Sequence, residues 1–317
     1  MKFYILAPAN ITSGGPELAH QMCHELLQLG HYAQMYYITD NQKEPTDAPC
    51  PDKYLKYGTT HVTDISEVES KDSVIIVPEG TTPWLQALNN CYKVLWWMSV
   101  DNYISATNEA NLPELKQCVN LHLVQSHYAY NYLINNVGIK EDNILYVSDY
   151  IGDIFRNTHL SNEYRKDIAL YNPKKGYENI IPLINKVTWL KWIPLINLTE
   201  EQLSLLMQVS KIYVDFGSHP GKDRIPREAA SCGCCVITNK EGSAAYYEDV
   251  PINDIYKYDN PCDNLDTIEL LMKDICSHFD EHYNLFENYR EIIRNERLQF
   301  TKNVKEMIEY ITHNLNT

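Results

Sequence analysis

The sequence predicts an α/β fold made of two Rossmann-like domains, each with a parallel sheet and helical crossovers. Its 317 residues suit two domains of ordinary size better than one. Short apolar runs alternate with helical stretches, and this alternation lapses near the middle of the chain before it starts again. Hydrophobic residues at 44% and charged residues at 22% are typical of a globular protein.

The first domain is predicted from an alternation that begins at the amino terminus. An apolar run over Phe3 to Ala7 predicts a strand, Pro16 to Leu29 a helix that Gly30 ends, and Tyr32 to Ile38 a second strand. Three further strands are predicted, over Ser73 to Val77, Val94 to Met98 and Leu121 to Gln125. The prolines between Asn41 and Tyr57 indicate a long irregular connection.

The domain boundary is predicted at residues 155/156, because hydrophobic periodicity lapses between Ile151 and Lys166. Residues 1–155 then form the first domain and residues 156–317 the second. Predicted strands of the second domain are Asp167 to Tyr171, Trp189 to Pro194, Ile212 to Phe216 and Cys235 to Thr238. Predicted helices are Gly176 to Asn185, Glu200 to Val209, Pro226 to Ser231 and a long one within Leu285 to Ile311.

Net charge, the length of the apolar runs and the spacing of the cysteines disfavour several classes of function. A formal net charge of -15 disfavours nucleic acid as a partner. No apolar stretch is long enough for a membrane helix, and the apolar run at the amino terminus is too short for a signal peptide, so we expect a cytoplasmic protein with at most peripheral membrane association. Among nine cysteines, Cys232 and Cys235 form a C-x-x-C without a second pair, which favours buried thiols in a tight turn over a metal site.

Several loops that follow predicted strands have the composition of anion sites. Gly14 and Gly15 open the first helix, where backbone N–H groups can meet an anion. Asn172, Lys174 and Lys175 follow the first strand of the second domain and can hold a diphosphate. A further candidate phosphate cradle, at the predicted start of another helix, is formed by Gly242, Ser243 and Ala244. Ordinary turn glycines and solvated lysines are the alternative interpretation.

The longest polar segment runs from Asp215 to Gly233, off a strand end, through a Gly/Pro loop and into a helix. The carboxyl ends of strands form the ligand crevice of an open α/β sheet, so His219, Lys222, Arg224 and Glu228 lie where a polar ligand would bind. A carboxylate at Glu228 can accept both hydroxyls of a ribose. Alternatively it only stabilises the helix dipole.

In order and content these segments resemble the B-fold (GT-B) glycosyltransferases, the retaining family-four-type group that includes sucrose and mannosyl transferases. The matching segments are Gly14 to Gly30, Gln125 to Tyr128, Val147 to Phe155, Asn172 to Gly176, Leu198 to Leu203 and Tyr213 to Ala245. The resemblance implies two domains facing each other across a cleft, a C-terminal helix packing back across them, and a nucleoside-diphosphate sugar as donor. Lys174, Lys175 and Arg224 would then neutralise the leaving diphosphate without a metal or other cofactor.

The signature of that group has two glutamates eight positions apart. Glu228 matches the second, but Pro220 stands in the place of the first. His219, Lys222 and Asp223 are the neighbouring side chains that can substitute for the missing carboxylate, and the sequence does not choose among them.

Catalytic groups of the first domain are predicted at strand ends, as the resemblance implies. Glu79 follows one strand and Asp101 another, and a carboxylate such as Asp101 can deprotonate an acceptor hydroxyl. An N-cap role is the alternative for Asp101. Trp96 and Trp97 are candidates for stacking on a sugar ring, although at least one of them is expected in the core.

The predicted function is therefore transfer of a sugar to a glycan, a lipid-linked acceptor or another hydroxyl, with surface polysaccharide biosynthesis suggested by family analogy alone. A sugar-nucleotide epimerase on the same fold and a non-catalytic sugar-nucleotide binder remain alternatives. A nicotinamide-dependent oxidoreductase is disfavoured, because no G-x-G-x-x-G follows the first strand.

Overall fold

The computed structural model describes residues 1–39, 48–156 and 160–315, which form two compact units. One unit comprises Met1–Asp149 with Leu298–Thr317, and the other comprises Tyr150–Arg297. Helix α13 (Glu287–Leu315) therefore begins in the second unit and ends in the first, as a terminal helix that returns to the first domain requires. The boundary predicted from sequence lay a few residues later, at 155/156.

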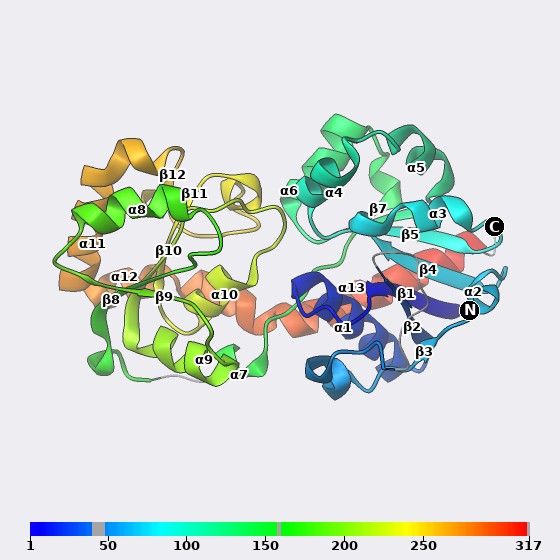
Figure 1. The fold of residues 1–317 in the computed structure, drawn as a ribbon, viewed down its shortest axis with the longest axis horizontal. Helices are drawn as coiled ribbons and strands as arrows, with labels where there is room; N and C mark the ends of the chain where they lie inside the picture. Colours follow the sequence, from blue (N-terminus) through cyan, green and yellow to red (C-terminus); the bar gives the residue numbers. More distant parts are fainter. Residues whose placement is uncertain (40–47, 157–159, 316–317) are drawn as a thin grey trace. The chain divides into compact units, whose positions relative to one another are not determined.

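The first unit contains a seven-stranded parallel sheet in the order β3-β2-β1-β4-β5-β6-β7 (Figure 1). Its strands are β1 (Lys2–Pro8), β2 (Tyr32–Ile38), β3 (His61–Val62), β4 (Ser73–Pro78), β5 (Tyr92–Trp97), β6 (Leu121–Val124) and β7 (Ile144–Tyr146). Its main helices are α1 (Gly14–Gln28), α2 (Ile65–Val68), α3 (Pro83–Ala87), α4 (Val100–Thr107), α5 (Leu112–Cys118) and α6 (His127–Tyr132). The chain reverses its direction of travel across the sheet between β1 and β4.

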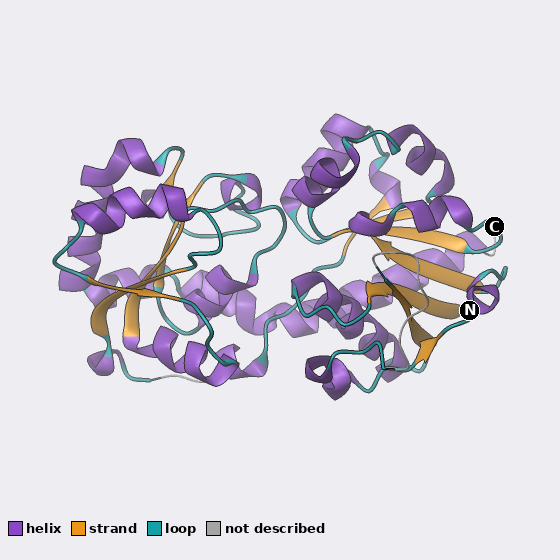
Figure 2. Ribbon diagram, viewed as in Figure 1, coloured by secondary structure: helices purple, strands orange, loops and turns teal. Residues whose placement is uncertain are grey.

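The second unit contains a five-stranded parallel sheet in the order β12-β11-β10-β8-β9. Its strands are β8 (Lys166–Tyr171), β9 (Lys191–Pro194), β10 (Ser210–Asp215), β11 (Cys235–Asn239) and β12 (Lys257–Tyr258). Its helices, besides α13, are α7 (Asp153–Arg156), α8 (Tyr177–Lys186), α9 (Glu200–Val209), α10 (Arg224–Ser231), α11 (Leu265–Ser277) and α12 (Phe279–Leu285) (Figure 2). Here the reversal falls between β8 and β10.

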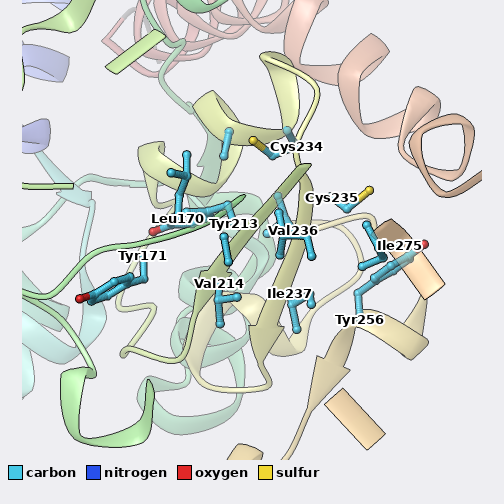
Figure 3. Close-up of a cluster of buried hydrophobic side chains, with 14 of the residues drawn as sticks. Leu170, Tyr171, Tyr213, Val214, Cys234, Cys235, Val236, Ile237, Tyr256 and Ile275 are labelled. Atoms are coloured by element: carbon cyan, nitrogen blue, oxygen red, sulfur yellow. The ribbon is translucent and has the colours of Figure 1, made fainter. Parts of the chain in front are cut away.

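These two reversals matter because ligands of open α/β sheets bind outside the carboxyl ends of the strands at such points. The central strands are apolar on both faces, since helices cover both sides of a parallel sheet. In the second unit the core includes Tyr213, Val214, Val236 and Ile237, which pair across β10 and β11 (Figure 3). The core fixes the strands, and the strands fix where their end loops begin.

The two Rossmann-like domains are thus confirmed, and the structure revises several details. Residues 41–47 of the predicted irregular connection and residues 157–159 of the predicted boundary segment lie outside the described residues. Asp52–Tyr57 form a 3-10 helix rather than an irregular loop. Trp96 and Trp97 are both fully buried, with indole N–H groups that donate to Val147 O and His122 Nδ1, so stacking of either on a sugar ring was a wrong expectation.

Candidate functional site

Three loops gather at the carboxyl edge of the sheet in the second unit. We name them the β8 loop (residues 172–176), the β10 loop (residues 216–223) and the β11 loop (residues 240–245), after the strands that they follow. Since β10 lies between β8 and β11 in the sheet, the β10 loop emerges between the other two. Most ligand-binding residues predicted for this domain are on these loops or on α10.

The β8 and β10 loops are packed too closely for side chains at two glycines. A Cβ atom on Gly176, which has a φ of +65°, would lie 2.4 Å from the carbonyl oxygen of Phe216. A Cβ on Gly217 would lie 2.4 Å from Cγ of Lys175. Asn179, in the first turn of α8, also contacts the β10 loop by donating from Nδ2 to Phe216 O over 3.0 Å. The aliphatic stem of Lys175 therefore lies directly against the β10 loop.

The β11 end of the sheet holds the β10 loop through three carbonyl groups. Asn239 Nδ2 donates to Gly217 O over 2.9 Å, Ser243 N to His219 O over 2.8 Å, and Ser243 Oγ to Gly221 O over 2.6 Å. The β10 loop is thus anchored at alternate residues.

The predicted helix start in the β11 loop is a four-residue 3-10 helix, Gly242–Ala245. Gly242 has a φ of +53°, and a Cβ there would collide with His219 O at 2.0 Å. Ser243 and Ala244 are buried, and the Ser243 amide already donates to His219 O. This geometry gives Ser243 a role in holding the β10 loop, and its role in phosphate binding stays a prediction.

A buried polar chain runs from β10 to the start of α10. Tyr213 donates its hydroxyl to Asp215 Oδ2 over 2.8 Å, and Asp215 Oδ1 lies 3.8 Å from Nε2 of His219. Nδ1 of His219 lies 2.8 Å from Oδ2 of Asp223. Burial and the Asp215 carboxylate raise the pKa of Tyr213 well above its ordinary value, so its phenol remains a proton donor.

Asp223 joins this chain to the β8 loop through an ion pair with Nζ of Lys175. Burial of the Asp223 carboxyl raises its pKa, but the hydrogen bond from His219 and the charge of Lys175 outweigh burial and leave the pKa below its usual range. The carboxylate is therefore ionised at neutral pH.

The other predicted cations differ in their surroundings. Lys174 is exposed, and its backbone N–H donates to Asn172 Oδ1 over 3.1 Å in an Asx turn. Lys222 instead directs its ammonium group to Glu296 Oε1 of α13, at 3.2 Å, and Arg227 contacts the other oxygen of Glu296 at 2.9 Å. The β8 loop thus presents one open cation, whereas Lys222 belongs to a buried charge network.

Helix α10 presents Arg224 and Glu228 four residues apart, so they share one helix face. Both side chains are half-buried. A small pocket behind the β10 loop is lined by His219, Lys222 and Asp223, together with Pro226, Ser243, Asp249, Val250 and Tyr289.

Three structural partners in this region were not predicted from the sequence: Asn239, Asp215 and Glu296. Asn239 and Asp215 are the last residues of their strands, a position that can indicate a polar role. Glu296 lies on a distant helix, and no local pattern marks it.

The first unit has its own polar edge at the ends of β1, β4 and β5. Glu79 follows β4, is buried, and accepts a hydrogen bond from the Met98 amide at Oε2 over 2.9 Å. Burial raises the pKa of Glu79 to about 7. A Cβ on Gly15 would lie 3.5 Å from Sδ of Met98, so the start of α1 adjoins the end of β5.

Asp101 lies in the first turn of α4 and is half-buried. It accepts a hydrogen bond from the Tyr128 hydroxyl over 2.6 Å. The N-cap of α4 is Ser99, whose hydroxyl accepts from Asn102 N over 3.3 Å, so the N-cap alternative for Asp101 is wrong.

Gly14 and Gly15 open the 15-residue helix α1, and Gly14 is exposed. The preceding residue, Ser13, is held by Tyr54, whose hydroxyl accepts from Ser13 N over 2.9 Å and donates to Ser13 O over 2.8 Å. The Gly-Gly turn therefore starts from an anchored residue.

The neighbouring cysteines of the second unit are buried thiols without disulfides. Cys232 donates to Phe155 O, and Cys234 to Met207 O over 3.1 Å. Across the described ranges, no group of three or more His, Cys, Asp or Glu side chains is arranged to hold a metal ion. Within the same ranges, no helix combines the length and apolar character needed to cross a membrane.

Two Rossmann-like domains in one chain are the arrangement found in the B-type glycosyltransferase fold. No protein-family model and no curated protein matches the sequence, but solved structures match its fold over nearly the whole chain. A glycosyltransferase from Rickettsia africae is 14% identical and covers 98% of each chain with a TM-score of 0.67. HepE of Anabaena, solved with UDP-glucose, is 10% identical over 98% of this chain and 99% of its own, with a TM-score of 0.68.

A third match is sucrose-phosphate synthase from Thermosynechococcus elongatus, 13% identical over 99% of this chain and 98% of its own, with a TM-score of 0.66. At such identities the likeness establishes the fold, and the chemistry has to be argued from the residues.

Proposed function

We propose that this protein is a glycosyltransferase that moves a sugar from a nucleoside-diphosphate sugar to a hydroxyl acceptor. The observation that carries the proposal is the convergence of Lys174, Lys175, Arg224 and Glu228 on the carboxyl edge of the second sheet, at its β8/β10 reversal. HepE, which shares the fold, was solved with UDP-glucose.

The residues suggest a division of roles within the donor site. Lys174 and Lys175 would bind the diphosphate, with Arg224 at the start of α10 as a third cation. Glu228, one turn further along α10, would accept the hydroxyls of the ribose. These cations neutralise the leaving group, so we propose transfer that needs no divalent metal.

The first unit would supply the groups that act on the acceptor. Asp101, held by Tyr128, would take the proton from the acceptor hydroxyl. The acceptor oxygen then forms a bond to the anomeric carbon, while the bond from that carbon to the diphosphate oxygen breaks and the nucleoside diphosphate leaves. Glu79 would hold the β5 end through Met98. His219, predicted as a catalytic residue, is 1% exposed, so we propose that it acts through Asp223, which it contacts, beside the position where the first signature glutamate is missing. A glycan or lipid-linked acceptor in surface polysaccharide biosynthesis, in the cytoplasm, rests on family analogy alone.

The first experiment is thermal-shift screening with UDP, GDP, CDP, CMP and ADP, each with and without magnesium. A ligand that binds only the folded state raises the melting temperature, so we expect one base to stabilise the protein equally under both conditions. Conversion of the matching nucleotide sugar to its epimer without an acceptor would identify an epimerase instead. Binding without turnover on any acceptor would identify a sugar-nucleotide binder.

The site assignment is tested by Glu228→Ala, with Glu178→Ala, at an exposed position of α8, as the matched control. Loss of the two ribose contacts should weaken nucleotide affinity about tenfold or more in calorimetry, whereas the control should bind like wild type. An affinity of Glu228→Ala within about twofold of wild type would show that Glu228 is not the ribose ligand.

A further inference from the structure

Asp223 occupies the N-cap position of α10, but its side chain does not cap the helix. An aspartate at this position ordinarily accepts a hydrogen bond from an N–H of the first turn. Here the backbone is extended and that hydrogen bond is absent. The carboxylate instead contacts Nδ1 of His219 and Nζ of Lys175. The Asp223 carboxylate therefore pairs with the lysine of the β8 loop instead of capping its own helix.

The Lys175–Asp223 ion pair and the His219 side chain differ in their exposure to solvent. The side chains of Lys175 and Asp223 are 22% and 26% exposed, so an anion from solvent can reach their ion pair. His219 is only 1% exposed and is held from behind by the β11 loop through Ser243. If Lys175 turned to another anion, Asp223 would keep the hydrogen bond from His219 and would not be left without a partner.

We infer that Asp223 is an internal competitor for Lys175: its carboxylate pairs with the ammonium group in the empty site, and the donor diphosphate displaces it. This inference rests on the proposed function, because it assigns Lys175 to the diphosphate. A diphosphate has more charge and more acceptor oxygens than one carboxylate, so it wins the exchange. The free energy needed to open the Lys175–Asp223 ion pair lowers the affinity of the site for the donor. When the ion pair forms again, it favours release of the nucleoside diphosphate product.

Asp223→Asn tests the competition without disturbing the fold. Asparagine caps helices as well as aspartate does and can still accept from His219, but it lacks the charge that holds Lys175. We expect calorimetry to show about fivefold tighter binding of the nucleoside diphosphate and of inorganic pyrophosphate. The matched control is Asp266→Asn, which removes an equal charge from the Lys186–Asp266 ion pair in the same unit and should leave both affinities unchanged.

The gain in anion affinity that Asp223→Asn produces must also depend on Lys175. In a Lys175→Met background, Asp223→Asn should give no further tightening, since there is no ammonium group to release. Circular dichroism and thermal melting of every variant check that the fold is retained.

The outcomes separate this inference from the proposed function. If nucleoside diphosphates bind wild type and Asp223→Asn binds neither them nor pyrophosphate more tightly, the competition is refuted and the donor site stands. Tighter pyrophosphate binding by Asp223→Asn, with no nucleoside diphosphate bound by any form, would support the competition and refute the proposed donor. Failure of every anion to bind any form would refute both.

Discussion

Both units present polar side chains at the carboxyl edge of their sheets, but the acidic side chains Glu79, in the first unit, and Asp223 and Glu296, in the second, have different surroundings. In the first unit Glu79 is buried against backbone amides, with its pKa raised to about 7. In the second unit two acidic side chains are paired with cations: Asp223 with Lys175, and Glu296 with Lys222 and Arg227. A carboxyl held only by amides can take up a proton near neutral pH, whereas carboxylates beside cations stay ionised.

This difference agrees with the separate roles proposed for the two units, donor binding in the second and action on the acceptor in the first. Binding of an anionic donor calls for fixed positive charge, and the second unit builds its cations into networks. In the first unit, by contrast, the carboxyl that holds the end of β5 is buried beside backbone amides, and its ionisation can change near neutral pH. The following predictions test the two halves of this comparison.

Removal of Glu296 should produce the largest effect. Glu296→Ala removes the carboxylate that contacts Arg227, which is 1% exposed, and breaking a buried pair in this way costs about 4 kcal/mol. Denaturant unfolding should show this loss of stability, and hydrogen exchange should place it in α10 and α13.

The control for Glu296 is Glu306→Ala, on the same helix, because Glu306 and its partner Lys302 are both exposed. Such a surface pair should contribute no more than about 1 kcal/mol. Equal destabilisation by the two variants would contradict the idea that the second unit relies on a buried charge network.

Much of this organisation could be predicted from the sequence, because local patterns determine it. Apolar runs between turn residues located β2 and α9 at their observed bounds, and the loops that follow the strands contain the predicted site residues. A parallel sheet brings such loops to one edge whatever their separation in sequence. The strand pattern therefore fixed the location of the candidate site.

The partners of those residues could not be predicted in the same way. Glu296 reaches Lys222 only through tertiary packing, and Asp223 has the ordinary sequence signature of an N-cap although it pairs with Lys175. Strands β3 and β12 have two residues each and are too short to show the alternation of apolar and polar residues that predicts a strand. Pairing between side chains that are distant in the sequence depends on three-dimensional proximity, which local spacing does not encode.

The raised pKa of Glu79 should give the first unit a distinctive pH dependence. The folded protein binds the Glu79 proton more tightly than the unfolded chain, so this stabilisation is complete below about pH 4.5 and is lost as pH rises through about 7. Glu79→Gln keeps an acceptor for Met98 but cannot ionise. At pH 8 it should therefore be more stable than wild type by about 3 kcal/mol, with little difference at pH 4.5.

The measured quantity for Glu79 is the difference between wild type and variant, since other groups titrate in the same window. One of them is His122, whose burial lowers its pKa to about 4. Denaturant unfolding at a series of pH values gives this difference, and Glu114→Gln, on the exposed face of α5, should follow the wild-type profile. A difference that does not change with pH would mean that Glu79 has the same pKa in the folded and unfolded states, and that the two units do not differ in this respect.

The smallest expected effect concerns the anchoring of the Gly-Gly turn in the first unit. Tyr54→Phe removes both hydrogen bonds to Ser13 while the buried ring remains, so the local cost should be about 1 kcal/mol. Amide exchange at Ser13 and Gly14 should accelerate about fivefold, because an opening free energy lower by that amount raises the open population accordingly. Tyr32→Phe removes an exposed hydroxyl that donates to Gln34 Oε1 and should leave this exchange unchanged. Unaltered exchange in Tyr54→Phe would show that the turn is held by its own backbone, and the first unit would then resemble the second, whose loops are locked at Gly176 and Gly242 by backbone packing.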